Sequence, residues 1–160
     1  FLAKWPARIA AGSRFGEPVA HVDLFATAAA AAGAKLPGDR VIDGVDLLAR
    51  ARGEIAGPVH DALFWRSGHY RALRAGDWKL QVSVRPQKSW LFDLAADPTE
   101  RVDLAGARPE KVAELKERLA KLESEMAKPL WPALVEGSVA IDHTLAEPLE
   151  PADEYVYWAN

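Results

Sequence analysis

The chain contains no cysteine among its 160 residues. Disulfides, thiolate metal ligands and a cysteine nucleophile are therefore excluded, although the redox compartment of the protein stays open. The chain also lacks an excess of positive charge, because 20 Lys and Arg stand against 23 Asp and Glu, which gives a net charge of −3. Nucleic-acid binding normally requires a basic surface, so we expect no nucleic-acid partner.

Long apolar runs are absent as well. The longest, residues 26–34, is rich in alanine and falls short of the roughly 18 residues that cross a bilayer, so we expect no membrane partner. Hydrophobic residues make up 49% of the chain and charged residues 27%, which is typical of a globular protein with a real core. The chain opens on Phe1-Leu2-Ala3-Lys4 without a methionine, and we interpret it as the interior of a longer protein.

The first third of the chain predicts one clear helix and a linker. Asp23 is suited to cap a helix that runs to residue 32, and Gly33 is suited to the left-handed position after it. This helix is apolar on nearly every side, which is typical of a helix buried among other elements. Residues 36–58 are rich in Gly, Pro and Asp and read as a linker, with a short helix near residues 45–52.

The rest of the chain predicts a sheet and a second helix. The extended segments are residues 62–65, 70–74, 78–84 and 90–94, of which 62–65 reads as a buried strand. The alternation of residues 70–74 and 78–84 favours an antiparallel sheet with one wet face. Residues 109–128 form the clearest helix, because apolar residues recur three and four apart. We expect its stripe to pack on the sheet, with a coiled-coil seam as the alternative. The tail is predicted to be irregular, with a strand or anchor at residues 155–158.

Five short motifs follow one another in a fixed order. They are Trp5-Pro6 with Gly12; residues 21–27 with Ala32-Gly33; residues 43–47; residues 74–80; and residues 91–94 continuing through Asp97-Pro98-Thr99-Glu100 to Asp103-Leu104. Together they resemble the C-terminal part of the arylsulfatase-like sulfatases, within the alkaline-phosphatase-like superfamily. Ala26 stands where that family usually has proline, and Asp103 where it usually has asparagine.

The resemblance implies an α+β fold: a small antiparallel sheet of about four strands, packed by a long C-terminal helix and preceded by a helical remnant of the parent α/β catalytic domain. Residues 1–57 would be that remnant plus a linker. Residues 58–128 would be the sheet-and-helix subdomain, and residues 129–160 an irregular tail with an aromatic end. The natural partner of such a chain is the missing N-terminal catalytic domain.

The resemblance also implies how a full-length enzyme works. Sulfatases hydrolyse sulfate esters with a formylglycine, made from Cys or Ser in a Cys/Ser-x-Pro/Ala-x-Arg motif, beside a calcium ion. No serine of this chain is followed by both the Pro/Ala and the Arg at that spacing. We therefore expect no catalytic residue, no metal site and no cofactor in this chain, and calcium and formylglycine only in the full-length enzyme.

Histidines give the remaining candidates for chemistry. His21 and Asp23 could bind a metal ion together, but a metal site would need at least a third ligand. The favoured interpretation is that Asp23 caps the helix and His21 packs or forms a hydrogen bond just before it. His60, Asp61 and His69 could form a proton-transfer cluster. The alternative is that they are ordinary loop residues with no chemical role.

The resemblance implies that loops of the C-terminal part rim the substrate pocket, and the polar stretch Ser67-Gly68-His69-Tyr70 is the connection best placed to do so. We therefore predict His69, Tyr70 and Arg71 as substrate-binding residues, although a strand arginine facing solvent is the favoured reading of Arg71.

Two hypotheses from different classes follow. The first is a C-terminal fragment of a sulfuric-ester hydrolase, which supplies scaffold and part of the pocket rim and is inactive alone. The second is a binding or assembly module that self-associates through the apolar helix, and we expect at least a dimer. A fragment of a related phosphoester or phosphonate hydrolase is the rival enzyme interpretation, because the C-terminal motifs do not report which anion the missing site binds.

Overall fold

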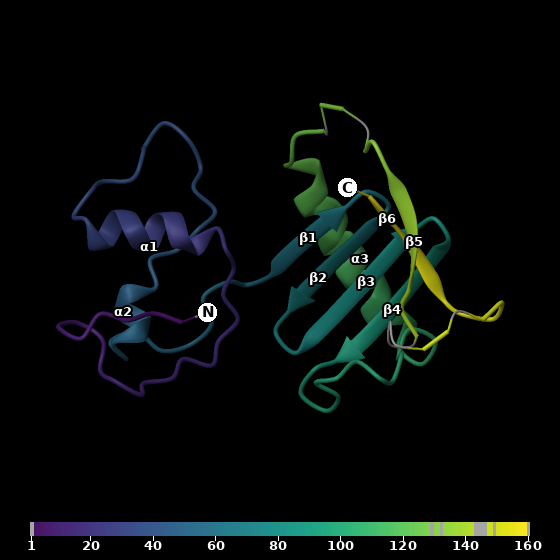
Figure 1. Cartoon of the computed structure of the whole chain (residues 1–160), viewed down its shortest axis with the longest axis horizontal. Helices are drawn as coiled ribbons and strands as arrows, with labels where there is room; N and C mark the ends of the chain where they lie inside the picture. Colours follow the sequence, from purple (N-terminus) through teal and green to yellow (C-terminus); the bar gives the residue numbers. More distant parts are fainter. Residues whose placement is uncertain (1, 129, 132, 143–146, 149, 160) are drawn as a thin grey trace. The chain divides into compact units, whose positions relative to one another are not determined.

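The computed structural model describes residues 2–128, 130–131, 133–142, 147–148 and 150–159 (Figure 1). The chain divides into two compact units, unit 1 (Phe1–Asp61) and unit 2 (Ala62–Asn160). In the described part of the chain, no helix is long and apolar enough to span a bilayer. The elements are α1 (Asp23–Ala31) and α2 (Leu48–Ala51) in unit 1, and β1 (Leu63–Ser67), β2 (Tyr70–Ala75), β3 (Trp78–Val84), β4 (Gln87–Asp93), α3 (Pro109–Ser124), β5 (Glu136–Ala140) and β6 (Tyr155–Ala159) in unit 2.

Unit 1 is built around α1, whose run of alanines favours a helix. Gly33 ends it in the left-handed conformation at φ 68°, as the sequence predicted. The predicted cap is wrong, because α1 begins at Asp23 itself, with Val22 at the N-cap position and no side-chain cap bond. The side chains of Leu24 and Phe25 remain 45% and 56% exposed, so within unit 1 the helix is covered on one side.

Unit 2 is a four-stranded antiparallel sheet in the order β1-β2-β3-β4. The register pairs Leu73 with Leu80 and Leu80 with Leu91, which aligns three leucines on one face. Leu115 and Leu119 of α3 join them in one buried core, so the predicted α+β fold and the packing of the helix on the sheet are confirmed.

Helix α3 is shorter than predicted. It ends at Ser124, four residues before the expected end at Lys128. The Ser124 hydroxyl donates to the Lys121 carbonyl at 2.7 Å, and a serine that bonds its own preceding turn in this way offers the backbone an alternative to further helix.

The second face of the sheet is not wet, which corrects the prediction from alternation. Strands β5 and β6 pair as an antiparallel ribbon, and Val156 of β6 packs on Trp90 and Phe92 of β4. Ser83 is buried on the same face. Figure 1 shows this ribbon and α3 on opposite sides of the sheet. The expected strand at residues 155–158 is confirmed, whereas β5 lies in a region that was predicted to be irregular.

Candidate functional site

Of the predicted substrate-binding residues, His69 lies in the turn between β1 and β2, and Tyr70 and Arg71 begin β2. His69 places its Nε2 atom 3.1 Å from Glu136 Oε1 on β5. The other Glu136 oxygen lies 3.5 Å from Arg85 Nη1, and the Arg85 guanidinium lies 4.3 Å from the centre of the Tyr157 ring. All three side chains in these ion pairs stay partly exposed. The cluster therefore ties the turn to the β5–β6 ribbon while leaving the His69 ring within reach of solvent.

Tyr70 and Arg71 point to opposite faces of the sheet, because adjacent strand residues alternate. The Tyr70 ring centre lies 5.7 Å from that of Trp158 on β6. Burial raises the pKa of Tyr70 to about 12, and the Glu100 carboxylate acts in the same direction, so the phenol stays protonated at neutral pH. Arg71 donates through Nε to Glu123 of α3. The structure therefore does not bring the three predicted side chains to one point.

In unit 1 the carboxylate of Asp23 is 0% exposed. It accepts hydrogen bonds from Ala20 N at 2.8 Å and Val45 N at 2.9 Å, and His60 Nε2 lies 2.9 and 3.0 Å from its two oxygens. Burial opposes the charged form, but the His60 ring and the two backbone N–H groups outweigh it, so the pKa of Asp23 is lowered. An ionised carboxylate in this position holds three segments of unit 1 together.

This geometry bears on both histidine candidates. Asp23 is bonded to His60 and to backbone amides instead of pairing with His21 at a metal. His60 in turn bonds Asp23, in unit 1, whereas His69 belongs to unit 2 and bonds Glu136. His60 and His69 are thus each held by a carboxylate that lies far away in the sequence.

Thr27 and Gly44 complete the junction between α1 and the following loop. The Thr27 hydroxyl accepts from Leu47 N at 3.1 Å and donates to Val45 O at 3.4 Å. Gly44 approaches so closely that an added Cβ would lie 2.1 Å from Val22 O. Two of the ordered motifs, residues 21–27 and 43–47, are therefore structural partners that hold each other.

A second pair of motifs meets in unit 2. Lys79 Nζ lies 2.7 Å from both oxygens of Glu100, and Gln81 Nε2 donates to the same carboxylate at 2.7 Å. Glu100 has a φ of 58°, in the left-handed region. The nearby Asp97 accepts from the backbone N–H groups of Val102 and Arg101, which outweigh desolvation and lower its pKa.

The calcium ion and formylglycine of full-length sulfatases do not fit the residues present. Across the described ranges, no group of three or more His, Cys, Asp or Glu side chains could hold a metal. The sequence has no cysteine, and none of its serines lies in the modification motif.

No protein family model matches the chain. Steryl-sulfatase of Homo sapiens is 38% identical over 97 residues, which are 61% of this chain and 16% of that protein. Arylsulfatase A of Bos taurus is 31% identical, in a match that covers 76% of this chain and 29% of that protein. The chain is related to the sulfatases. The resemblance predicted from the ordered motifs is thereby confirmed.

Solved structures agree with this relation to the sulfatases. The crystal structure of Ps i-CgsB matches with a TM-score of 0.66 at 29% identity, over 79% of this chain and 29% of that chain. A 2-O GAG sulfatase matches with a TM-score of 0.54 at 25% identity, over 64% of this chain and 24% of that chain. The chain spans less than a third of the length of the sulfatases it matches.

Sequence reasoning missed the polar partners that lie far along the chain. Glu136 holds His69, and Glu123 holds Arg71, yet neither glutamate belongs to a motif. No local signal identifies them, because each becomes a partner only when the ribbon or the helix is folded against the sheet.

Proposed function

We propose that this chain is the C-terminal scaffold of a sulfuric-ester hydrolase and that it is inactive alone. The observation that supports the proposal best is the use of the shared motifs. Asp23 and Thr27 hold the loop at residues 44–47, and Lys79 holds Glu100. Side chains engaged in this way stabilise a fold, and the chain supplies no nucleophile of the sulfatase type.

The β1–β2 turn is proposed to form part of the rim of the substrate pocket in the complete enzyme. His69 keeps a partly exposed ring and is the group that would touch an anionic substrate. Tyr70 and Arg71 are positioning residues in this proposal, because their contacts with Trp158 and Glu123 fix the strand that carries the turn. The names of the relatives include both steryl-sulfatase and N-acetylgalactosamine-6-sulfatase. We therefore propose that the substrate of the complete enzyme is a sulfate ester, without choosing one compound.

The 160-residue chain is expected to show no turnover of p-nitrophenyl sulfate above the buffer rate, with or without added calcium. Circular dichroism with a cooperative thermal transition provides the control that the assayed chain is folded. Metal-dependent release of p-nitrophenol by a folded sample would contradict the proposal, since it would require a nucleophile within these residues.

A second candidate function, self-association, is favoured by the exposed side of α1. Leu24 and Phe25 lie side by side there, about half exposed, and apolar patches of this kind are commonly covered by a partner. In the complete enzyme the partner of this surface is proposed to be the N-terminal catalytic domain. In the isolated chain, a second copy would take its place.

Light scattering coupled to size-exclusion chromatography is expected to give at least a dimer at micromolar concentration. The double change Leu24→Gln with Phe25→Gln should move the mass toward the monomer, because it removes the apolar contact. Val41→Gln is the matched control, since Val41 is also exposed but lies in a loop outside α1. A monomeric wild-type chain would rule out the self-association.

A further inference from the structure

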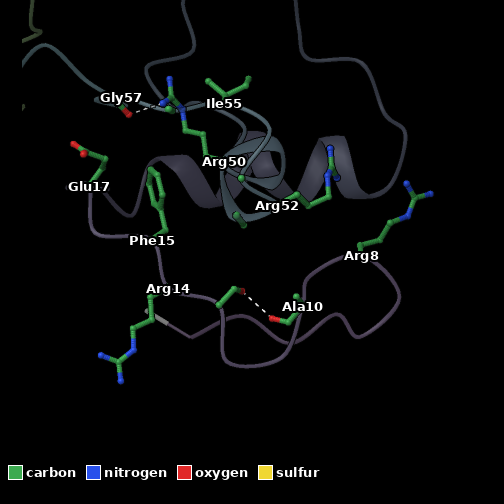
Figure 2. A pocket seen from close by; sticks show the side chains of 13 residues that line it. Arg8, Ala10, Arg14, Phe15, Glu17, Arg50, Arg52, Ile55 and Gly57 are labelled. Carbon is green, nitrogen blue, oxygen red and sulfur yellow. Dashed lines mark hydrogen bonds between the residues drawn. The ribbon is translucent and has the colours of Figure 1, made fainter.

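Unit 1 contains a hollow of about 550 Å³ between residues 8–17 and residues 50–57 (Figure 2). This volume lies within the range of roughly 300 to 1,000 Å³ that is typical of small-molecule sites. Four of the lining residues are arginines, and one is a glutamate, Glu17. Because the whole chain carries a net charge of −3, this excess of positive charge is local. The arginines are Arg8, Arg14, Arg50 and Arg52.

The four guanidinium groups are not equally available. Arg52 forms a two-bond pair with Glu54, at 2.6 and 2.8 Å, and is neutralised by it. Arg50 donates one bond to Gly57 O at 2.7 Å, and a guanidinium has five N–H donors in all. Arg8 lies over the Trp5 ring at 5.8 Å from its centre. Arg8, Arg14 and Arg50 therefore retain donors for a ligand.

The direction of these side chains decides the kind of ligand. Figure 2 shows Arg8, Arg14 and Arg50 spread around the hollow, with Arg14 and Arg8 on different sides and their guanidinium groups pointing apart. A single small anion cannot contact all of them. A ligand that carries several anionic groups along a chain can, and linked contacts of this kind reinforce one another through effective concentration.

The wall between the arginines is partly apolar. Phe15 and Ile55 line the hollow and are both partly exposed, and Figure 2 shows Phe15 between Arg14 and Arg50. A sugar ring presents an apolar C–H face that suits such a wall. Sulfate groups on the same ligand match the planar fork of donors that a guanidinium presents.

We propose that this hollow is an accessory binding site for a sulfated oligosaccharide, held by sulfate groups at two or more of Arg8, Arg14 and Arg50. The choice of sulfate as the anion rests on the proposed function, whereas the binding itself needs no catalysis. The site would hold a polymeric substrate or product by a segment that is not being hydrolysed.

Isothermal titration of the 160-residue chain with a heparin-derived hexasaccharide tests the inference. We expect saturable binding that is at least about tenfold tighter than that of inorganic sulfate at equal sulfate concentration, because several linked contacts form. An unsulfated hexasaccharide should not bind. Rising salt should weaken the interaction, as it does for exposed charges.

Variants locate the site. Arg14→Gln and Arg8→Gln should each weaken hexasaccharide binding about three- to tenfold, since each removes one charge-assisted contact. Arg40→Gln is the matched control, because Arg40 pairs with the exposed Asp39 in the same unit and does not line the hollow. The thermal unfolding midpoint of each variant must match that of the wild type. If a variant is destabilised, chemical-shift changes in the wild-type chain on addition of the hexasaccharide locate the site instead, and they should fall on residues 8–17 and 50–57.

Three results would overturn the inference: no binding of the hexasaccharide, equal losses for Arg40→Gln and Arg14→Gln, or equally tight binding of an oligodeoxynucleotide of the same charge, which would indicate attraction by charge alone. The proposed function fails on a different readout. Hydrolysis of an aryl sulfate by the chain would contradict inactivity and leave the binding data untouched, whereas absent binding would remove the accessory site alone.

Discussion

Replacing Gly44 by alanine is expected to destabilise unit 1 by about 3 kcal/mol, as severe overpacking does. The added Cβ would lie 2.1 Å from Val22 O and 2.6 Å from Val22 C. These are backbone atoms at the start of α1, so no side-chain rotation can relieve the clash. The loop must move away from the helix, and that movement breaks the bonds from Val45 N to Asp23 and from Leu47 N to Thr27.

Hydrogen exchange followed by mass spectrometry measures this effect unit by unit. Amides in residues 1–61 should lose protection in Gly44→Ala, whereas those of the sheet and α3 should keep it. Gly38→Ala is the matched control, because an added Cβ at Gly38 has no atom within 4 Å. If both variants exchange alike, the close approach at Gly44 does not limit the stability of unit 1.

Removal of the Asp23 carboxylate is expected to be at least as damaging. Asp23→Ala leaves the N–H groups of Ala20 and Val45 and the His60 ring without their acceptor in a buried place. Breaking a buried, hydrogen-bonded pair by deleting one partner costs about 3 to 5 kcal/mol. Asp23→Asn keeps the shape and one acceptor oxygen, so it should recover part of the loss.

The lowered pKa of Asp23 predicts how this contribution depends on pH. The usual value of the carboxyl is 3.8, and in the folded chain it lies below that. Above about pH 4 both states are ionised and the full stabilisation is present. As the pH falls below that value, the unfolded chain binds the proton first, so the stability is lost progressively through the folded pKa.

Urea unfolding at pH 6 and pH 3, monitored by amide exchange in residues 1–61, checks both statements. The difference in the free energy of unfolding of unit 1 between the wild type and Asp23→Ala should be larger at pH 6 than at pH 3. Asp39→Ala is the control, since Asp39 pairs with Arg40 at an exposed site and exposed ion pairs contribute little to stability. A gap that stays constant with pH would mean that the charge on Asp23 does not stabilise unit 1.

The sequence predicted the sheet well because its signals are local. Alternation identified β2 and β3, and short apolar runs identified β1 and β4. The three-and-four spacing of Leu115, Leu119 and their neighbours identified α3 and its buried face. The ribbon was harder. Strand β5 has the sequence Glu-Gly-Ser-Val-Ala, which has little preference for a strand. In β6, Val156 is buried because it packs on Trp90 and Phe92 of β4, which are distant in the sequence.

The polar contacts were predicted less well, and the reason is distance along the chain. Asp23 stands just before a helix, where a cap is the ordinary expectation, yet its partners Val45 and His60 lie 22 and 37 residues away. The family motifs identified structurally important residues but did not indicate which of them contact one another. The hollow in unit 1 had no local signal, because its arginines come from two segments, residues 8–14 and residues 50–52, that lie far apart in the sequence.

Position 100 illustrates how two requirements can oppose each other at one residue. A backbone at φ 58° favours glycine, but glycine would leave the ammonium of Lys79 and the amide of Gln81 without their shared acceptor. Glycine at this position would relieve the backbone but remove the acceptor, whereas glutamate supplies the acceptor but keeps an unfavourable backbone conformation. We therefore expect variation at this site to be coupled, so that glycine at position 100 becomes acceptable only in descendants that have first replaced the lysine.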